Sequence, residues 1–258
     1  MPEAPALALS GRAVLVTGAS SGIGRAIALA VARAGADVAV TYRSNRAGAE
    51  SVAREIESLG RRALVLPLDL ADEPAIERLG PAVQAGLGRL DVWINNAGAD
   101  ILTGPAAGLS TVQKLDLLLA VDLRGTILAS WAAARFFDEQ ESGGAIINMS
   151  WDHIATGMAG TNPQMFAAVK GGVAAFSRGL ARSVAPRVRV NVIAPGWIET
   201  SFGERLDSAT YRSVADSTPL RRWGTPEDVA GAAVFLASPA AGFITGQTIN
   251  IGGGVVMG

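Results

Sequence analysis

Short runs of apolar and β-branched residues alternate with amphipathic stretches from one end of the chain to the other. This alternation is typical of a parallel sheet with helices on both faces, because strands that are covered on both sides are apolar throughout. The pattern therefore predicts one α/β domain over residues 1–258. We expect its strands at Ala13–Thr17, Asp37–Tyr42, Ala63–Leu66, Asp91–Asn95, Ala145–Met149, Val188–Ile193 and Gln247–Ile251.

Helices are expected between these strands. After the first strand, apolar residues recur at helical spacing up to Ala34, and Gly35 can supply a left-handed cap. Between Asp72 and Gly88 we expect a broken helix, because Pro81 would cost about 3 kcal/mol inside a continuous one. Further helices are expected at Glu50–Leu59, Asp122–Gln140 and Pro163–Val184, and after the cap Thr225-Pro226-Glu227-Asp228.

One segment shows no regular spacing of apolar residues. Residues 196–218 are rich in Pro, Gly, Thr and Ser, and at this length they predict a mobile functional lid over a substrate.

Composition excludes several classes of protein. With 49% hydrophobic and 17% charged residues, the chain can bury a large core, so it is not intrinsically disordered. Its 22 basic and 23 acidic residues include no basic block, so we expect no nucleic-acid partner. The absence of Cys and the single His153 argue against disulfides, thiolate catalysis and a metal site. No apolar run of ~18 residues and no leader pattern are present, so we expect no membrane partner and a cytoplasmic location.

The first candidate site is the turn Thr17-Gly18-Ala19-Ser20-Ser21-Gly22-Ile23-Gly24, which follows a buried strand and opens a helix. A turn without side chains lets a phosphate approach the backbone and the helix N-terminus, whose partial positive charge favours an anion. The spacing is Gly-x3-Gly-x-Gly rather than the commoner G-x-G-x-x-G. In its strand–turn–helix context, this turn predicts a dinucleotide cofactor.

With three further motifs in order along the chain, the sequence resembles the short-chain dehydrogenase/reductases. These motifs are Asn95-Asn96-Ala97-Gly98, Pro195-Gly196-Trp197-Ile198-Glu199-Thr200, and the ending formed by Thr245-Gly246-Gln247 with Gly252–Gly254. The resemblance implies a single Rossmann-type domain with a doubly wound parallel sheet of about seven strands. It also implies a nicotinamide cofactor at the strand ends, a small-molecule substrate, and a homo-oligomer, either tetramer or dimer.

The same resemblance implies which residues touch the cofactor. Asp69 and Leu70 would contact the adenine, Asn95, Ala97 and Gly98 would flank the adenosine, and Lys170 would hold the ribose. The remaining expected cofactor residues are Gly18, Ser20, Ser21, Gly22, Ile23 and Gly24 in the glycine turn, and Pro195, Gly196, Ile198 and Thr200 after the sixth strand.

The choice between NAD and NADP depends on the end of the second strand, where NAD enzymes place an acid against the ribose 2′-hydroxyl. Here the chain reads Thr41-Tyr42-Arg43-Ser44, without a carboxylate. Because Arg43, Ser44 and Ser20 can donate to a 2′-phosphate, the sequence favours NADP(H).

The chain departs from the family at the catalytic tyrosine. The family pairs a Tyr with a Lys four residues later, so that the phenol can give or take a proton. Here Lys170 is present, but Phe166 stands in the tyrosine position. Phe166 is interpreted either as a core residue or as a wall of the substrate pocket, and the two are compatible.

Other groups near that position could replace the phenol as proton donor. The family's catalytic Ser would be Ser150 if the following loop is about two residues longer, and Asp152 and His153 lie close by. Histidine has an unperturbed pKa of about 6.5, which suits proton transfer. The string around Trp151 and Asp152 is also similar to pteridine reductases. Asp122 stands where the family usually has an Asn, and it could serve a proton relay or pair with Arg124.

We therefore expect an NADPH-dependent oxidoreductase that reduces a C=O or C=N bond of a small, largely apolar substrate with a non-standard proton donor. Trp151, Phe166 and Trp197 are expected to line its pocket. An iminium substrate would tolerate Phe166 better than a ketone, since it is already protonated. Two alternatives stay open: a catalytically silent nucleotide-binding subunit, and an enzyme similar to pteridine reductases.

Overall fold

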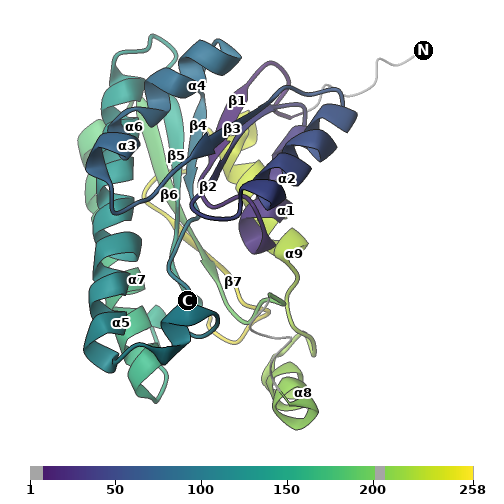
Figure 1. Ribbon diagram of the computed structural model, residues 1–258, viewed down its shortest axis with the longest axis vertical. Coiled ribbons are helices and arrows are strands. Elements are labelled where there is room, and N and C mark those ends of the chain that lie inside the picture. The colour runs from purple at the N-terminus through teal and green to yellow at the C-terminus, as the bar shows by residue number, and fades with distance from the viewer. Residues whose placement is uncertain (1–7, 201–206, 258) are drawn as a thin grey trace.

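The computed structural model describes residues 8–200 and 207–257, which form a parallel sheet covered by helices on both faces (Figure 1). The sheet has seven strands in the order β3-β2-β1-β4-β5-β6-β7, and every pairing is parallel. This confirms the predicted doubly wound sheet. The strands are β1 (Ala13–Val16), β2 (Asp37–Tyr42), β3 (Ala63–Pro67), β4 (Val92–Asn95), β5 (Gly144–Met149), β6 (Val188–Pro195) and β7 (Thr248–Ile251).

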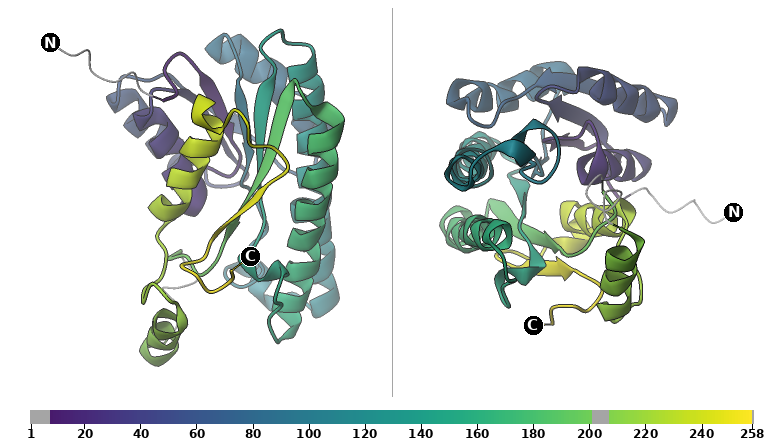
Figure 2. Two further views of the ribbon diagram at one scale, coloured as in Figure 1. Left: turned by 180° about the vertical axis from the view of Figure 1, so that it is seen from behind. Right: turned by 60° about the horizontal axis from the view of Figure 1, so that its bottom comes forward.

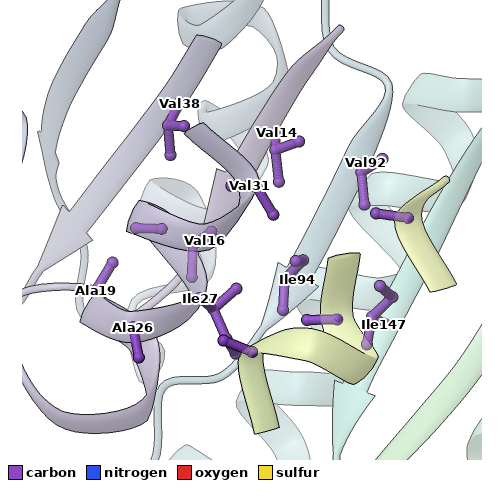
Figure 3. Packing of buried hydrophobic residues seen from close by; sticks show 14 of the residues in the cluster. Val14, Val16, Ala19, Ala26, Ile27, Val31, Val38, Val92, Ile94 and Ile147 are labelled. Atoms are coloured by element: carbon purple, nitrogen blue, oxygen red, sulfur yellow. The ribbon is translucent and has the colours of Figure 1, made fainter. Parts of the chain in front are cut away.

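Two helical layers sandwich the sheet, and the right-hand view of Figure 2 shows them on either side of the strands. Buried residues of α1 (Gly22–Arg33), α2 (Arg46–Ser58) and α9 (Pro226–Ala237) form a core with one face of the sheet. Figure 3 shows part of that core, where Ile27 and Val31 lie among strand residues. The other face is covered by α3 (Glu73–Glu77), α4 (Leu79–Leu87), α6 (Thr126–Asp138) and α7 (Thr161–Val184).

The sheet order creates a reversal between β1 and β4. From β1 to β3 each new strand is added toward one edge of the sheet, and from β4 to β7 each is added toward the opposite edge. Ligands of open α/β sheets bind beside such a reversal, outside the carboxyl ends of the strands. The fold thus places a binding site where the glycine turn after β1 meets the loop after β4.

Two sequence-based expectations about helices are matched closely. The chain does break between α3 and α4, and Pro81 lies in the first turn of α4, where a missing N–H costs nothing. Thr225 and Asp228 form a reciprocal capping box at the start of α9.

The helical segment before β5 is longer than expected. It begins with α5 (Thr111–Leu118), capped by Ser110, and passes through a π-helical stretch, Leu119–Gly125, into α6. By length and composition the whole run could cross a membrane, but 56% of its most apolar window is buried inside the protein. In the expected lid, residues 201–206 lie outside the described residues, and Ser208–Ser217 form a helix, α8, that was not expected (Figure 1).

Candidate active site

The glycine turn fits against the loop after β4. A Cβ placed on Gly18 would lie 2.8 Å from Cα of Ala97, and one on Gly24 would lie 2.3 Å from the carbonyl oxygen of Gly18. Gly18 also has a φ of +64°, which favours glycine. Only glycine therefore allows the start of α1 to approach the ends of β1 and β4 so closely.

Two polar residues that the sequence analysis did not single out hold this junction together. Thr17 Oγ1 accepts hydrogen bonds from the backbone N–H groups of Asn96 and Ala97, both at 3.0 Å. The Asn96 amide nitrogen donates to the Thr17 carbonyl at 2.9 Å. Their signal in the sequence was a polar residue directly at the end of each apolar strand.

The turn fits the phosphates of a dinucleotide. The side chain of Ser21, the N-cap of α1, makes no capping hydrogen bond, so it does not cover the N–H groups of the first turn. A Cβ on Gly22 would meet nothing within 4 Å, so the space over this helix start is open. Open N–H donors at a helix N-terminus form a site for a phosphate.

The end of β2 lies against the same turn. Gly18 N donates to Thr41 Oγ1 at 3.1 Å, and Ala19 N donates to the Thr41 carbonyl at 2.9 Å. Arg43 and Ser44 follow two and three residues later and are exposed. Within residues 8–200 and 207–257, Arg43 makes no hydrogen bond or ion pair with the protein. Its guanidinium is available for an anion beside the turn.

Not every predicted cofactor residue presents its side chain to this region. Leu70 is buried in the core, where it contacts Gly125, while Asp69 is exposed and caps Ala71 N. Asn95 is only 2% exposed, and its amide is engaged with Trp93, Ser130 and Asn148. The contacts of Asn95 and Leu70 with an adenosine stay a prediction, and their buried side chains leave the backbone to make them.

A cavity of about 550 Å³ opens at the carboxyl ends of the strands. It receives many of the predicted site residues, including Lys170, Ser150, Asp122, Trp151, Phe166 and Trp197. Predicted cofactor residues in its wall are Ile23, Gly98, Pro195, Gly196, Ile198 and Thr200. Met158, which the sequence suggests for a hydrophobic pocket together with Trp151 and Trp197, also lines the cavity. Asn96, Asp100, Ile101, Asn162 and Trp223 line it too and were not expected there.

Lys170 and Asp122 form a buried ion pair in the cavity wall. Lys170 Nζ lies 2.9 Å from Asp122 Oδ2, and the two side chains are 7% and 1% exposed. Asp122 comes from the π-helical stretch, and its Oδ1 accepts from Ala99 N at 2.7 Å. This answers the open question on Asp122, which pairs with Lys170, while Arg124 pairs with Glu73.

Phe166 lies one helical turn before Lys170, is half-buried, and lines the cavity. The ammonium of Lys170 lies 5.4 Å from the centre of its ring, a distance at which the ring face attracts a cation. The same side chain packs on the small cluster formed by Ile101, Leu118, Met165 and Val169. Phe166 is thus both a core residue and a wall residue.

Ser150 also lines the cavity, but its hydroxyl donates to the Lys170 carbonyl oxygen at 2.8 Å. This hydrogen bond ties the end of β5 to α7. Ser150 therefore supports the helix that carries Phe166 and Lys170.

Asp152 and His153 lie behind the cavity wall and are not among the described residues that line it. His153 Nδ1 is 2.5 Å from Asp152 Oδ1, and both residues are buried. Asp152 Oδ2 has no hydrogen-bond partner and faces the backbone, since a Cβ on Gly196 or Gly252 would lie within 2.4 Å of it. Burial raises the pKa of Asp152, while the hydrogen bond from His153 opposes that rise.

Comparison with known proteins supports an enzyme site. A sequence model of a family described as enoyl-(acyl carrier protein) reductase matches residues 18–256. The chain is 37% identical to a 3-oxoacyl-[acyl-carrier-protein] reductase of Synechocystis sp., over 97% of this chain and 99% of that protein.

Two solved structures are similar over nearly their whole length. One is a putative short-chain alcohol dehydrogenase from Sinorhizobium meliloti, with a TM-score of 0.87 and 38% identity over 97% of this chain and 98% of the other. The second is a blue fluorescent protein from a metagenomic library in complex with NADPH, with a TM-score of 0.85 and 31% identity over 97% and 100%.

Proposed function

We infer the function from the premise that this chain belongs to the short-chain dehydrogenase/reductase family. Its relatives are oxidoreductases, and its structural neighbours include a complex with a nicotinamide cofactor. On that premise we propose that the protein is an NADPH-dependent oxidoreductase that reduces a C=O or C=N bond of a small, largely apolar substrate.

The observation that carries this proposal is one continuous region at the strand ends. The open helix start with Arg43 beside it fits the phosphates, and the cavity with Lys170 adjoins it through Ile23 and Asn96. When bound there, a dihydronicotinamide would supply a hydride, which is a proton with two electrons, to the substrate. The protein itself binds and orients the cofactor and the substrate, and it delivers a proton where the substrate needs one.

A C=O substrate needs that proton as the hydride arrives, and the donor has to reach the cavity. We assign this role to the Lys170 ammonium, which lines the cavity and is held by Asp122. Asp152 and His153 lie one layer behind, so we propose that they fix the loop carrying Trp151. The donor role that the sequence predicts for Asp152 or His153 is the alternative to this assignment. Because the Lys170 ammonium is already paired with Asp122, we expect reduction of simple ketones to be slow.

The cofactor preference is tested by titrating NADPH and NADH into the wild type and into Arg43→Ala. Losing one hydrogen bond to a charged group costs about 1.5–3 kcal/mol, so NADPH affinity should fall roughly 10- to 150-fold, while NADH affinity stays. Arg54→Ala removes another exposed charge, from within α2, and should change neither affinity. Equal affinities for both cofactors in the wild type would refute the preference.

Activity itself is tested by turnover with NADPH and a panel of ketones and imines. Reduction of any member supports an oxidoreductase. Tight NADPH binding without turnover of any of them would instead favour the silent nucleotide-binding subunit. The homo-oligomeric state and the cytoplasmic location remain predictions beside this proposal.

A further inference from the structure

Six rings follow one another along one side of the cavity. They come from Phe166, Trp151, His153, Trp197, Trp223 and Tyr211, and successive ring centres are 5.5, 4.9, 6.1, 5.4 and 5.0 Å apart. Only 5% of the chain is Phe, Trp or Tyr, yet three of its five tryptophans belong to this run. Phe166, Trp151, Trp197 and Trp223 line the cavity directly. The rings are therefore concentrated where a substrate would bind.

Their mutual angles give the cavity aromatic corners rather than one flat wall. Phe166 meets Trp151 at 69°, and Trp197 meets Trp223 at 65°. His153 stacks on Trp151 at 22° and meets Trp197 edge-on, so it acts as a spacer between the two indoles. Asp152 in turn binds the His153 ring through Nδ1. This buried pair therefore fixes the spacing of the two tryptophans.

The charge of Lys170 is balanced within the cavity wall. Among the described residues that line the cavity, the ionisable side chains are Asp100, Asp122 and Lys170. Lys170 is paired with Asp122 and lies over one face of Phe166. Asp100 also lines the wall and accepts hydrogen bonds from Leu102 N and Thr103 N. Because Asp122 pairs with the ammonium of Lys170, the aromatic faces of the cavity favour a cation over a neutral or anionic ligand.

We propose that this cavity recognises a cationic, planar C=N substrate, an aromatic or ring-fused iminium ion. The inference rests on the proposed function and names its substrate class. In the reaction, the iminium carbon accepts the hydride and forms a C–H bond, and the C=N π pair moves onto nitrogen and neutralises its charge. The substrate is reduced by two electrons, the dihydronicotinamide is oxidised by two, and no proton is added.

This stoichiometry explains why Phe166 is tolerable. A ketone becomes an alkoxide unless a proton arrives, so it depends on an acid near the reacting carbon. An iminium ion becomes a neutral amine directly. A ring that stabilises a cation is then more useful at this position than a phenol that donates a proton.

Binding is measured first, with two probes of one shape. N-methylisoquinolinium carries the charge and 2-methylnaphthalene does not, and both are titrated into the protein with NADP⁺ present, which cannot deliver a hydride. Indole fluorescence and calorimetry report the affinities. We expect the cation to bind at least about tenfold more tightly than the neutral probe, in the range of cation–π effects. Equal or weaker binding of the cation overturns the proposal.

Variants then test whether the rings cause the preference. Trp151→Leu and Trp197→Leu should lose about fivefold or more in affinity for the cation and less for the naphthalene. Trp131→Leu removes an indole of α6 that lies outside the cavity, and it should leave both affinities unchanged. Trp151→Phe keeps a ring and should restore most of the preference if the Leu variant is poorly folded. Equal losses for both probes would mean that the rings act only as apolar surface.

Turnover separates this inference from the proposed function. N-methyl-3,4-dihydroisoquinolinium and 1-tetralone share a ring skeleton and are compared with NADPH, after subtraction of the rate without protein. We expect the permanently charged iminium to be reduced at least about 100-fold faster, within the range ascribed to acid catalysis. Reduction of tetralone with no preference for the cation leaves the proposed function intact and overturns this inference. Selective binding of the cation without any turnover supports the recognition and refutes the oxidoreductase function.

Discussion

Phe166 takes the position in α7 from which a phenol hydroxyl would reach into the cavity, one turn before Lys170. We predict that Phe166→Tyr raises ketone reduction by about 10²–10⁴-fold, since a positioned general acid contributes that much. The added phenol hydroxyl would lie in the cavity beside the Lys170 ammonium. The positive charge of Lys170 makes it easier for the phenol to give up its proton. The measurement is kcat/KM for 1-tetralone with NADPH in both proteins.

Phe176→Tyr is the matched control for that substitution. Phe176 lies on the same helix but contacts Trp131, outside the described lining of the cavity. The Phe176→Tyr variant should leave ketone reduction unchanged. If the Phe166 variant gains nothing, or if the wild type already reduces tetralone efficiently, a missing phenol does not limit this enzyme.

Asp152 makes a separate prediction about stability, because burial raises its pKa in the folded protein. An acid with a raised pKa contributes most to folding below its ordinary pKa of about 3.9, and that contribution is lost as the pH rises through the raised value. The wild type should therefore lose stability relative to Asp152→Asn between about pH 3.5, below that ordinary value, and about pH 7. Urea unfolding at both pH values measures the two free energies.

Asp116→Asn provides the comparison, since Asp116 is exposed on α5. The wild type should not lose stability relative to Asp116→Asn over this pH range in the way that it does relative to Asp152→Asn. A difference between the wild type and Asp152→Asn that is constant with pH would show that the carboxyl does not titrate between these values.

Some of these residues could be read from the sequence and others could not. The glycines were predictable because the close approach of two backbones requires them. The role of Arg43 at the end of β2 stays a prediction from its charge. The depth of Asp152 and His153 was not, since a residue next to a strand end can point to the cavity or away from it. The Lys170–Asp122 pair joins two helical segments 48 residues apart, and only tertiary packing brings it together.

At the scale of elements, the cap of α9 is the clearest case in which a local sequence signal and the structure agree. Asp228 accepts from Thr225 N at 2.7 Å and pairs with Arg222 at 2.6 Å, and these contacts hold its pKa well below the ordinary value. We predict that Asp228→Asn destabilises the fold by ~1 kcal/mol at pH 7, the usual size of a capping loss. Urea unfolding measures this difference.

The pH dependence of this effect follows from the lowered pKa. A carboxylate with a depressed pKa contributes fully above its ordinary pKa of about 3.9, and loses that contribution as the pH falls through the lower folded value. The difference between wild type and Asp228→Asn should therefore shrink in acid. Glu227→Gln, an exposed neighbour in the same turn, should cost little at either pH. If Asp228→Asn lowers the free energy of unfolding as much in acid as at pH 7, the effect comes from packing and not from the charge of the carboxylate.

The strands and α7 were predictable to within two residues because buried β-branched runs and a long apolar stripe are strong signals. The start at Thr111 was missed because half of α5 is exposed and its residues are mixed in polarity, although Ser110 and Gln113 carry a capping-box signal. The π-helical stretch could not have been foreseen. Its Asp122 is held by Ala99 N and Lys170, both far away in the sequence.

At the scale of the whole molecule, the parallel sheet brings together loops from four separate parts of the chain. Residues after β1, β4, β5 and β6 meet in one cavity because all these strands end at the same edge. The alternation of strands and helices predicts this meeting. It does not predict which side chains of each loop face the cavity, because that depends on loop conformations with no repeating pattern.

The outer face of α6 and α7 bears on the predicted homo-oligomer. Trp131 is 47% exposed there and packs edge-on against Phe176 at 5.9 Å, beside a groove of about 520 Å³. Small residues in this groove, Ala134, Gly179 and Ser183, would let another helix approach closely. An exposed apolar patch of this kind commonly marks a protein–protein contact, and a symmetric dimer presents the same patch from both copies.

We predict that Trp131→Glu shifts the protein toward the monomer, because the substitution would place two like charges near the symmetry axis of an apolar interface. Light scattering after size exclusion measures the mass of wild type and variant. Phe243→Glu is the control, since Phe243 is fully exposed and far from this groove along the chain. It should leave the mass unchanged. A wild type that is already monomeric, or a Trp131→Glu variant with the mass of the wild-type oligomer, would show that this face does not join two copies.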